Sequence, residues 1–290
     1  MTAHSLDRQG SLPADIPVRL ENGAPFDEQS LALVDETVAL RRCALYRNAF
    51  KGTAAVSYPA ELLGYDALAA WIRRHGVTVD VKTVAELERA TAQGIDTMHI
   101  VMHPHGRAVA PIRHAVNAGV GRFVVGSSHQ IGFLGSCVDQ IQRVVIDATD
   151  GDAGTLAQEA VAQHALDVIG LHCTLGADDA IGAIKLRQVI AEMASFRREH
   201  GVLLTRVSLA GLDIGARCLD PRILRRVAEG IGEVVADACA QYRFPRPALT
   251  LSPSCNTLLP GVANRRLHSG QSNVHSLTTD HIHGQTAYTI

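Results

Sequence analysis

Three consecutive segments decide the fold: Arg143-Val-Val-Ile-Asp-Ala-Thr149, the amphipathic run Gly154–Gln163, and Asp167-Val-Ile-Gly-Leu-His-Cys-Thr174. The two outer segments are short and continuously apolar rather than alternating, which is typical of parallel strands buried on both faces. The segment between them has the spacing of a helix. Together they predict one β-α-β unit, and the same alternation continues along the chain in both directions.

Eight segments have the character of strands: Ala54–Tyr58, Thr78–Lys82, Met98–His103, Arg122–Ser127, Arg143–Thr149, Asp167–Thr174, Arg206–Ala210 and Ala248–Ser252. Helical spacing is found in Glu28–Ala49, Tyr65–His75, Val84–Gln93, Val109–Ala118, Gly154–Gln163, Asp179–His200 and Pro221–Tyr242. Eight β-α units in about 200 residues favour a closed (β/α)8 barrel over a doubly wound sheet. No glycine-rich phosphate fingerprint follows the first strand, which argues further against a dinucleotide-binding fold.

The sequence therefore predicts an α/β protein with a TIM-like barrel over residues 25–263. A polar segment precedes the barrel at residues 1–24, and a polar tail containing histidines follows it at 264–290. The tail histidines have no spacing that would fix a metal site, so we expect a loosely packed terminus there.

Composition excludes several classes of protein. The 290 residues carry a net charge of −2 and are 47% hydrophobic, so nothing indicates a nucleic-acid partner. We see no signal peptide and no apolar run long enough to span a membrane. The six cysteines form no CxxC pair, as is usual for free thiols in a reducing compartment. We expect a cytoplasmic protein that binds neither membrane nor nucleic acid.

In such a barrel the functional side chains lie at the carboxyl ends of the strands. Asp80 and His172 are the candidate acid–base residues there, and both also have a purely structural interpretation. Lys82 shares the strand parity of Asp80, so it is the lysine that can point into the barrel mouth. A metal site made by His103, His105 and His172 is a further alternative, although no carboxylate obviously completes it. We predict no metal.

Several segments resemble, in order and spacing, the barrel of the fold-type III PLP-dependent decarboxylases, the diaminopimelate/ornithine decarboxylase family, related in fold to alanine racemase. Thr78–Lys82 with Glu86-Leu87 is similar to the family's "DVxSxxEL", and Ile100–His105 stands where the family has a strand ending in "HGN". Ala118–Val125 is close to its fourth strand, and Gly170–Gly176 resembles "GLHxHIGS". The resemblance covers approximately Pro25–Ala263.

The resemblance implies a set of positions that would bind the cofactor, and this chain departs from the family at each. The lysine that carries pyridoxal phosphate (PLP) falls on Ser57, and the imidazole that stacks on its ring falls on Thr174. The glycine triplet near the phosphate falls on Ala210-Gly211-Leu212. The "EPGR" segment falls on Ser252–Cys255, so the acid and an arginine are lost.

From this resemblance we expect a degenerate decarboxylase-like barrel that lacks the family's C-terminal β-domain and does not use PLP. It would bind an amino-acid-like small molecule, either as a repurposed enzyme or as a partner subunit. We expect a homo-oligomer or a hetero-oligomer with an intact paralogue. The alternative is an active PLP-dependent decarboxylase or racemase, with Lys82 as a displaced lysine or with a separately encoded β-domain. The only other lysines are Lys51 and Lys185.

Overall fold

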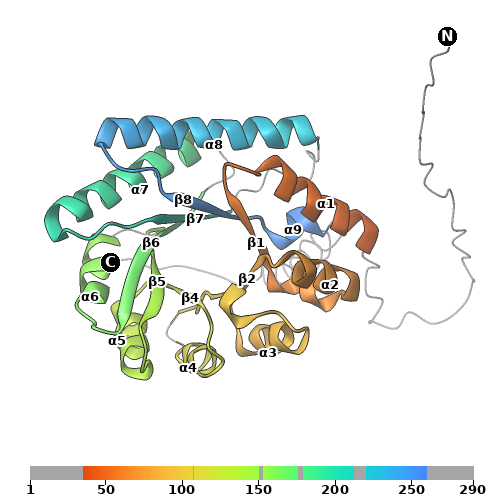
Figure 1. Ribbon diagram of the computed structural model, residues 1–290, viewed down its shortest axis with the longest axis horizontal. Coiled ribbons are helices and arrows are strands. Elements are labelled where there is room, and N and C mark those ends of the chain that lie inside the picture. The colour runs from red at the N-terminus through yellow and green to blue at the C-terminus, as the bar shows by residue number, and fades with distance from the viewer. Residues whose placement is uncertain (1–34, 107, 150–152, 176–178, 212–219, 260–290) are drawn as a thin grey trace, which may run out of the picture. The chain divides into compact units, whose positions relative to one another are not determined.

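Eight parallel strands close into a barrel in a computed structural model that describes residues 35–106, 108–149, 153–175, 179–211 and 220–259 (Figure 1). The strands pair in chain order, and β1 pairs with β8 to close the ring. They are β1 Ala55–Pro59, β2 Thr78–Val81, β3 Ile100–Met102, β4 Arg122–Val125, β5 Gln142–Asp147, β6 Leu166–Thr174, β7 Arg206–Ala210 and β8 Ala248–Ser252. The predicted (β/α)8 barrel is confirmed.

Helices alternate with the strands and surround the barrel (Figure 1). They are α1 Glu36–Ala49, α2 Asp66–His75, α3 Val84–Ala92, α4 Ala110–Asn117, α5 Ser128–Cys137, α6 Ala153–Val161, α7 Asp179–His200, α8 Pro221–Tyr242 and the short α9 Cys255–Leu258. Two 3₁₀ turns, η1 Ala60–Gly64 and η2 Thr97–His99, complete the described elements. No described helix combines the length and the apolar character that a membrane span requires.

The sequence pattern is wrong at several element boundaries. Helix α1 begins at Glu36 because the Asp35 side chain caps it, accepting hydrogen bonds from the next backbone amides, so the predicted start at Glu28 is too early. Strand β3 is shorter than predicted because the turn η2 occupies its expected beginning. Helix α5 was not predicted, since Gly132 and Gly135 interrupt its apolar pattern.

Apolar side chains pack in two separate places. A large core fills the space between the sheet and the helices. A small cluster of Val101, Val124 and Val145, with Ile169 against it, fills the barrel interior. Inward positions on a strand lie two residues apart, so His103 stands one layer nearer the carboxyl ends than Val101. The valine layer thus forms an apolar floor beneath the polar residues of the barrel mouth.

Candidate functional site

A cavity of about 980 Å³ opens at the carboxyl ends of the strands. Seven of the eight predicted site residues line it: Asp80, Lys82, His172, Thr174, Gly211, Ser252 and Cys255. The eighth, Ser57, is buried beneath it on β1 and contacts the site through Asp80. The residues predicted from the sequence to form one site are therefore also close together in the structure.

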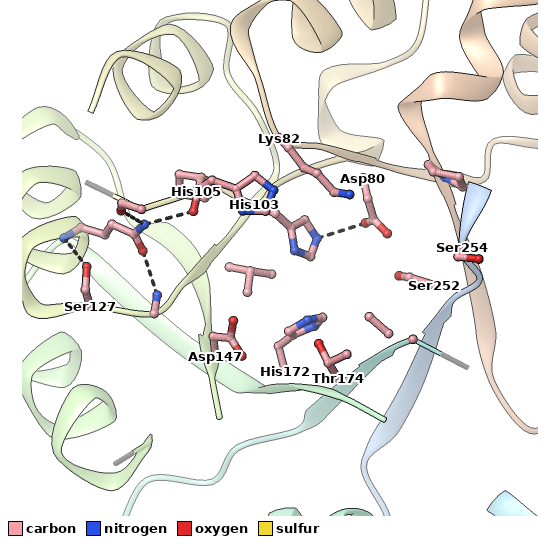
Figure 2. A pocket seen from close by; sticks show the side chains of 18 of the residues that line it. Asp80, Lys82, His103, His105, Ser127, Asp147, His172, Thr174, Ser252 and Ser254 are labelled. Atoms are coloured by element: carbon pink, nitrogen blue, oxygen red, sulfur yellow. Dashed lines mark hydrogen bonds and ion pairs between the residues drawn. The ribbon is translucent and has the colours of Figure 1, made fainter. Parts of the chain in front are cut away.

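Asp80 lies at the centre of the site. Ser57 donates a hydrogen bond from its hydroxyl to Asp80 Oδ1 over 2.7 Å, and His103 Nε2 lies 3.3 Å from the same oxygen (Figure 2). The register explains these contacts, because β2 lies between β1 and β3 and pairs Asp80 with Pro59 and Val101. Ser57 is two residues before one partner, and His103 is two residues after the other.

Asp80 is ionised in this setting. Its burial opposes a negative charge, but the charge of His103 and the hydrogen bonds from His103 and Ser57 outweigh that cost and lower the pKa of the carboxyl. The buried hydroxyl of Ser252 also lowers this pKa, although it forms no hydrogen bond of normal geometry to any described residue. Ser57 does not contact an imidazole, so the group is not a nucleophilic serine with a histidine base.

His172 has the opposite charge preference. It is 5% exposed, its Nδ1 lies 3.0 Å from Ser208 Oγ, and its ring meets that of His103 edge-on with centroids 5.3 Å apart. Burial, followed by the charge of His103, lowers the pKa of His172 from 6.5 to about 4, against smaller opposite effects of Asp147 and Asp80. His172 is therefore neutral near pH 7, with an imidazole on the cavity wall that can accept or donate a proton.

Lys82 enters the cavity from the end of β2. Its backbone amide donates to Glu86 Oε2 over 2.6 Å, while Thr83 caps helix α3, so the backbone on both sides of the lysine is fixed. Its side chain points into the same space as Asp80 (Figure 2). Its ammonium forms no ion pair within 4.0 Å with a carboxylate of the described chain.

Thr174 is held by its neighbours rather than directed freely into the cavity. Its backbone amide donates to Thr149 Oγ1 over 3.1 Å, and the same Thr149 hydroxyl bonds Asp147 Oδ1 over 2.5 Å. Lys185 Nζ donates to the Thr174 carbonyl over 3.0 Å. Lys185 thus binds the backbone at the end of β6 and does not line the cavity.

Gly211 requires glycine. Its φ is +71°, and an added Cβ would lie 2.5 Å from the carbonyl oxygen of Leu175 and 2.7 Å from Thr174 Cγ2. The backbone of β7 therefore closes tightly against the end of β6. Leu212, the third residue of the expected phosphate segment, lies outside the described residues.

Gln130 was missed by the sequence analysis. It is 4% exposed; its Oε1 accepts from Gly126 N over 2.8 Å, and its Nε2 donates to the carbonyls of Pro104 and Gly106 over 3.0 and 2.9 Å. It therefore connects the loop after β3, which carries His103, to the loop after β4. A single glutamine in a helix that was not predicted gave no signal in the sequence.

The alternative metal site has no geometric support. No three histidine, cysteine, aspartate or glutamate side chains in the described ranges are placed to hold an ion. His103 instead bonds Asp80, and His172 bonds Ser208. The contact of His103 with Asp80 was not predicted from the sequence.

Comparison with known proteins supports the resemblance. Residues 37–160 match the family model "Pyridoxal-dependent decarboxylase, pyridoxal binding domain". The diaminopimelate decarboxylase of Mycobacterium tuberculosis is 26% identical over 274 residues, which are 80% of this chain and 60% of that protein. The enzyme of the same name from Actinosynnema pretiosum is 24% identical over 254 residues, covering 76% of this chain and 56% of the relative.

Solved structures show the same fold. The crystal structure of diaminopimelate decarboxylase from M. jannaschii superposes with a TM-score of 0.66 at 18% identity, over 78% of this chain and 60% of that one. Lysine decarboxylase from Selenomonas ruminantium gives a TM-score of 0.62 at 16% identity, over 75% and 59%. The chain thus spans about 60% of the length of the relatives it matches. In its barrel, the chain is therefore similar in sequence and in fold to the PLP-dependent decarboxylases.

Proposed function

We propose that this decarboxylase-like barrel no longer holds PLP as a Schiff base and uses its mouth to bind a small, polar, amino-acid-like molecule. One observation carries the proposal. Ser57 occupies the position where the family resemblance places the lysine, and its hydroxyl donates to Asp80 over 2.7 Å. A serine hydroxyl cannot form the imine that a lysine amine forms with the cofactor aldehyde.

The residues around Ser57 do not fit the cofactor either. An acid that would keep a pyridine nitrogen protonated is replaced in Ser252–Cys255, and the stacking imidazole is replaced by Thr174. The groups on the wall include the carboxylate of Asp80, the imidazoles of His103 and His172, and the ammonium of Lys82. Such groups bind a polar ligand and transfer protons to or from it. The ordered pair of Asp80 and His103 is the candidate acid–base unit, and neutral His172 is its neighbour.

The second candidate function is an active PLP enzyme that uses Lys82. It is favoured by a specific observation, since Lys82 lies on the same cavity wall and no carboxylate of the described chain neutralises its ammonium.

Absorbance and chemical trapping decide between the two. The purified chain is mixed with PLP, scanned for the visible band of a Schiff base, reduced with borohydride and analysed by mass spectrometry. We expect no lysine to be modified stoichiometrically, and Lys82→Ala to behave like wild type. A stoichiometric band that Lys82→Ala abolishes and Lys185→Ala preserves would overturn the proposal. Lys185 is the matched control because its ammonium bonds a backbone carbonyl away from the cavity wall.

As part of the same proposal, the chain assembles either with a second decarboxylase-like chain or with copies of itself. Co-purification from the native host tests it. We expect a second decarboxylase-like chain in the complex, or else a homo-oligomer. A monomer that binds no second chain at physiological concentration contradicts both.

A further inference from the structure

Three arginines gather at the end of the barrel opposite the mouth. Arg122 begins β4, Arg206 begins β7, and Arg143 is the second residue of β5. Each stands two residues before a side chain that faces the barrel interior, and inward positions recur every two residues. Those side chains are Val124, Ser208 and Val145, all on the wall of one interior void.

Two of the guanidinium-bearing side chains converge from well-separated strands. Strands β5 and β6 separate β4 from β7, yet Arg122 and Arg206 line the same void of about 20 Å³, which Asp80 also lines from above. That volume admits about one water molecule. The two side chains therefore close the barrel from below, while Arg143 is more exposed at the rim.

The positive charge of this cluster is not balanced within the described chain. No described carboxylate lies within 4.0 Å of any of the three guanidinium groups. Asp167 pairs with Arg143 in the strand register but forms no ion pair with it. Burial, followed by the charge of Arg206, lowers the pKa of Arg122; Asp80 opposes this and Arg143 adds to it. Asp80 already bonds His103 and Ser57, so it offsets only part of three positive charges.

We propose that Arg122, Arg143 and Arg206 form a binding site for a phosphate group at the amino-terminal end of the barrel, separate from the mouth. Guanidinium groups present several N–H donors in a plane that matches the oxygens of phosphate, and clustered arginines are stabilised by such an anion. The interior void is too small for phosphate, so the anion binds on the solvent side of Arg122 and Arg206, with Arg143 within reach. The proposal does not depend on what the mouth binds.

The competing explanation is purely structural. The aliphatic stems of Arg122 and Arg206 would cover the valine layer, while water solvates the charged heads. In that case the cluster has no preference for phosphate over other anions.

Titration calorimetry of the full chain with inorganic phosphate, in a chloride buffer of constant ionic strength, separates the two. We expect saturable binding with one phosphate per chain, which Arg122→Gln and Arg206→Gln weaken about tenfold or more. Arg143→Gln weakens it less, and Arg246→Gln leaves it unchanged. Arg246 is the matched control because it is an exposed arginine whose guanidinium donates to the Gly232 carbonyl and does not line the interior void.

Three results would overturn the proposal. One is that phosphate gives no more heat of binding than an equal addition of chloride. Another is that the phosphate affinity of Arg122→Gln and Arg206→Gln equals that of wild type, and the third is that Arg246→Gln weakens phosphate binding as much as they do. If the two more buried variants do not fold, the exposed Arg143→Gln decides, and unchanged phosphate affinity in it refutes the site. A parallel titration with glycerol 3-phosphate identifies the source of the group. Tighter binding of the ester indicates a phosphorylated metabolite, and equal or weaker binding indicates the free ion.

Discussion

The neutrality of His172 makes a quantitative prediction about stability and pH. The folded protein holds the pKa of His172 at about 4, against 6.5 for the free side chain. Between these values the unfolded chain binds a proton that the folded chain does not, so the free energy of unfolding falls as pH decreases. The penalty begins near pH 6.5, is complete near pH 4, and amounts to about 3 kcal/mol in total, of which about 2 kcal/mol develops between pH 7 and pH 5.

Asp80 does not contribute to the change in unfolding free energy between pH 7 and pH 5. Its folded pKa is lowered from 3.8, so its contribution to stability is fully present above that value and is lost only in more acidic solution. The interval from pH 7 to pH 5 therefore reports His172 and not the carboxylate.

Urea unfolding at pH 7 and pH 5 measures the effect. Wild type should lose about 2 kcal/mol more than His172→Gln over this interval, whatever the absolute stability of the variant. His105→Gln is the control, because His105 is exposed, and it should keep the wild-type pH dependence. Parallel pH dependence in wild type and His172→Gln would refute the assigned charge state, as would a His172 resonance that titrates above pH 6 by NMR.

Three substitutions test other contacts, each by the free energy of unfolding in urea. Ser57→Ala removes a hydrogen bond from a buried carboxylate and should cost about 1–3 kcal/mol. Gly211→Ala forces a Cβ against a carbonyl oxygen at positive φ and should cost about 2 kcal/mol or more, whereas Gly132→Ala, with open space inside a helix, should be neutral or stabilising by up to about 1 kcal/mol. Gln130→Leu leaves buried backbone groups without their partner and should cost about 2–3 kcal/mol, with faster amide exchange at Gly126.

The barrel could be predicted because its information is local. The strand segments Arg206–Ala210 and Ala248–Ser252 have the same bounds in the sequence prediction and in the structure. Their spacing alone indicates parallel strands connected by helices. The prediction is wrong where the local sequence is ambiguous. Gly132 and Gly135 interrupt the apolar spacing of α5, so that helix was not predicted. The turn η2 before β3 resembles a strand in sequence, so β3 was predicted too long.

The gathering of site residues was predictable, but their pairing was not. The barrel rule brings the residues at strand ends to one cavity, and seven of the predicted eight line it. The contact of His103 with Asp80 depends on the register between β2 and β3, which no sequence pattern specifies. The bond from Ser57 to Asp80 likewise depends on the pairing of β1 with β2. Sequence therefore predicted the members of the site and not its hydrogen bonds.

The buried Asp80 beside His103 and His172 has a physical explanation that does not require catalysis. A buried carboxylate is tolerated only when donors surround it, and here they come from three strands: Ser57 on β1, His103 after β3 and Ser252 on β8. Removing Asp80 would leave His103 without its partner and change the charge next to His172. With ring centroids only 5.3 Å apart, a proton on one imidazole disfavours a proton on the other. Asp80 lies 3.3 Å from His103, and its charge also acts on His172, so one carboxylate influences both rings. A ligand that binds there meets this fixed charge pattern, and the same pattern stabilises the barrel when no ligand is bound.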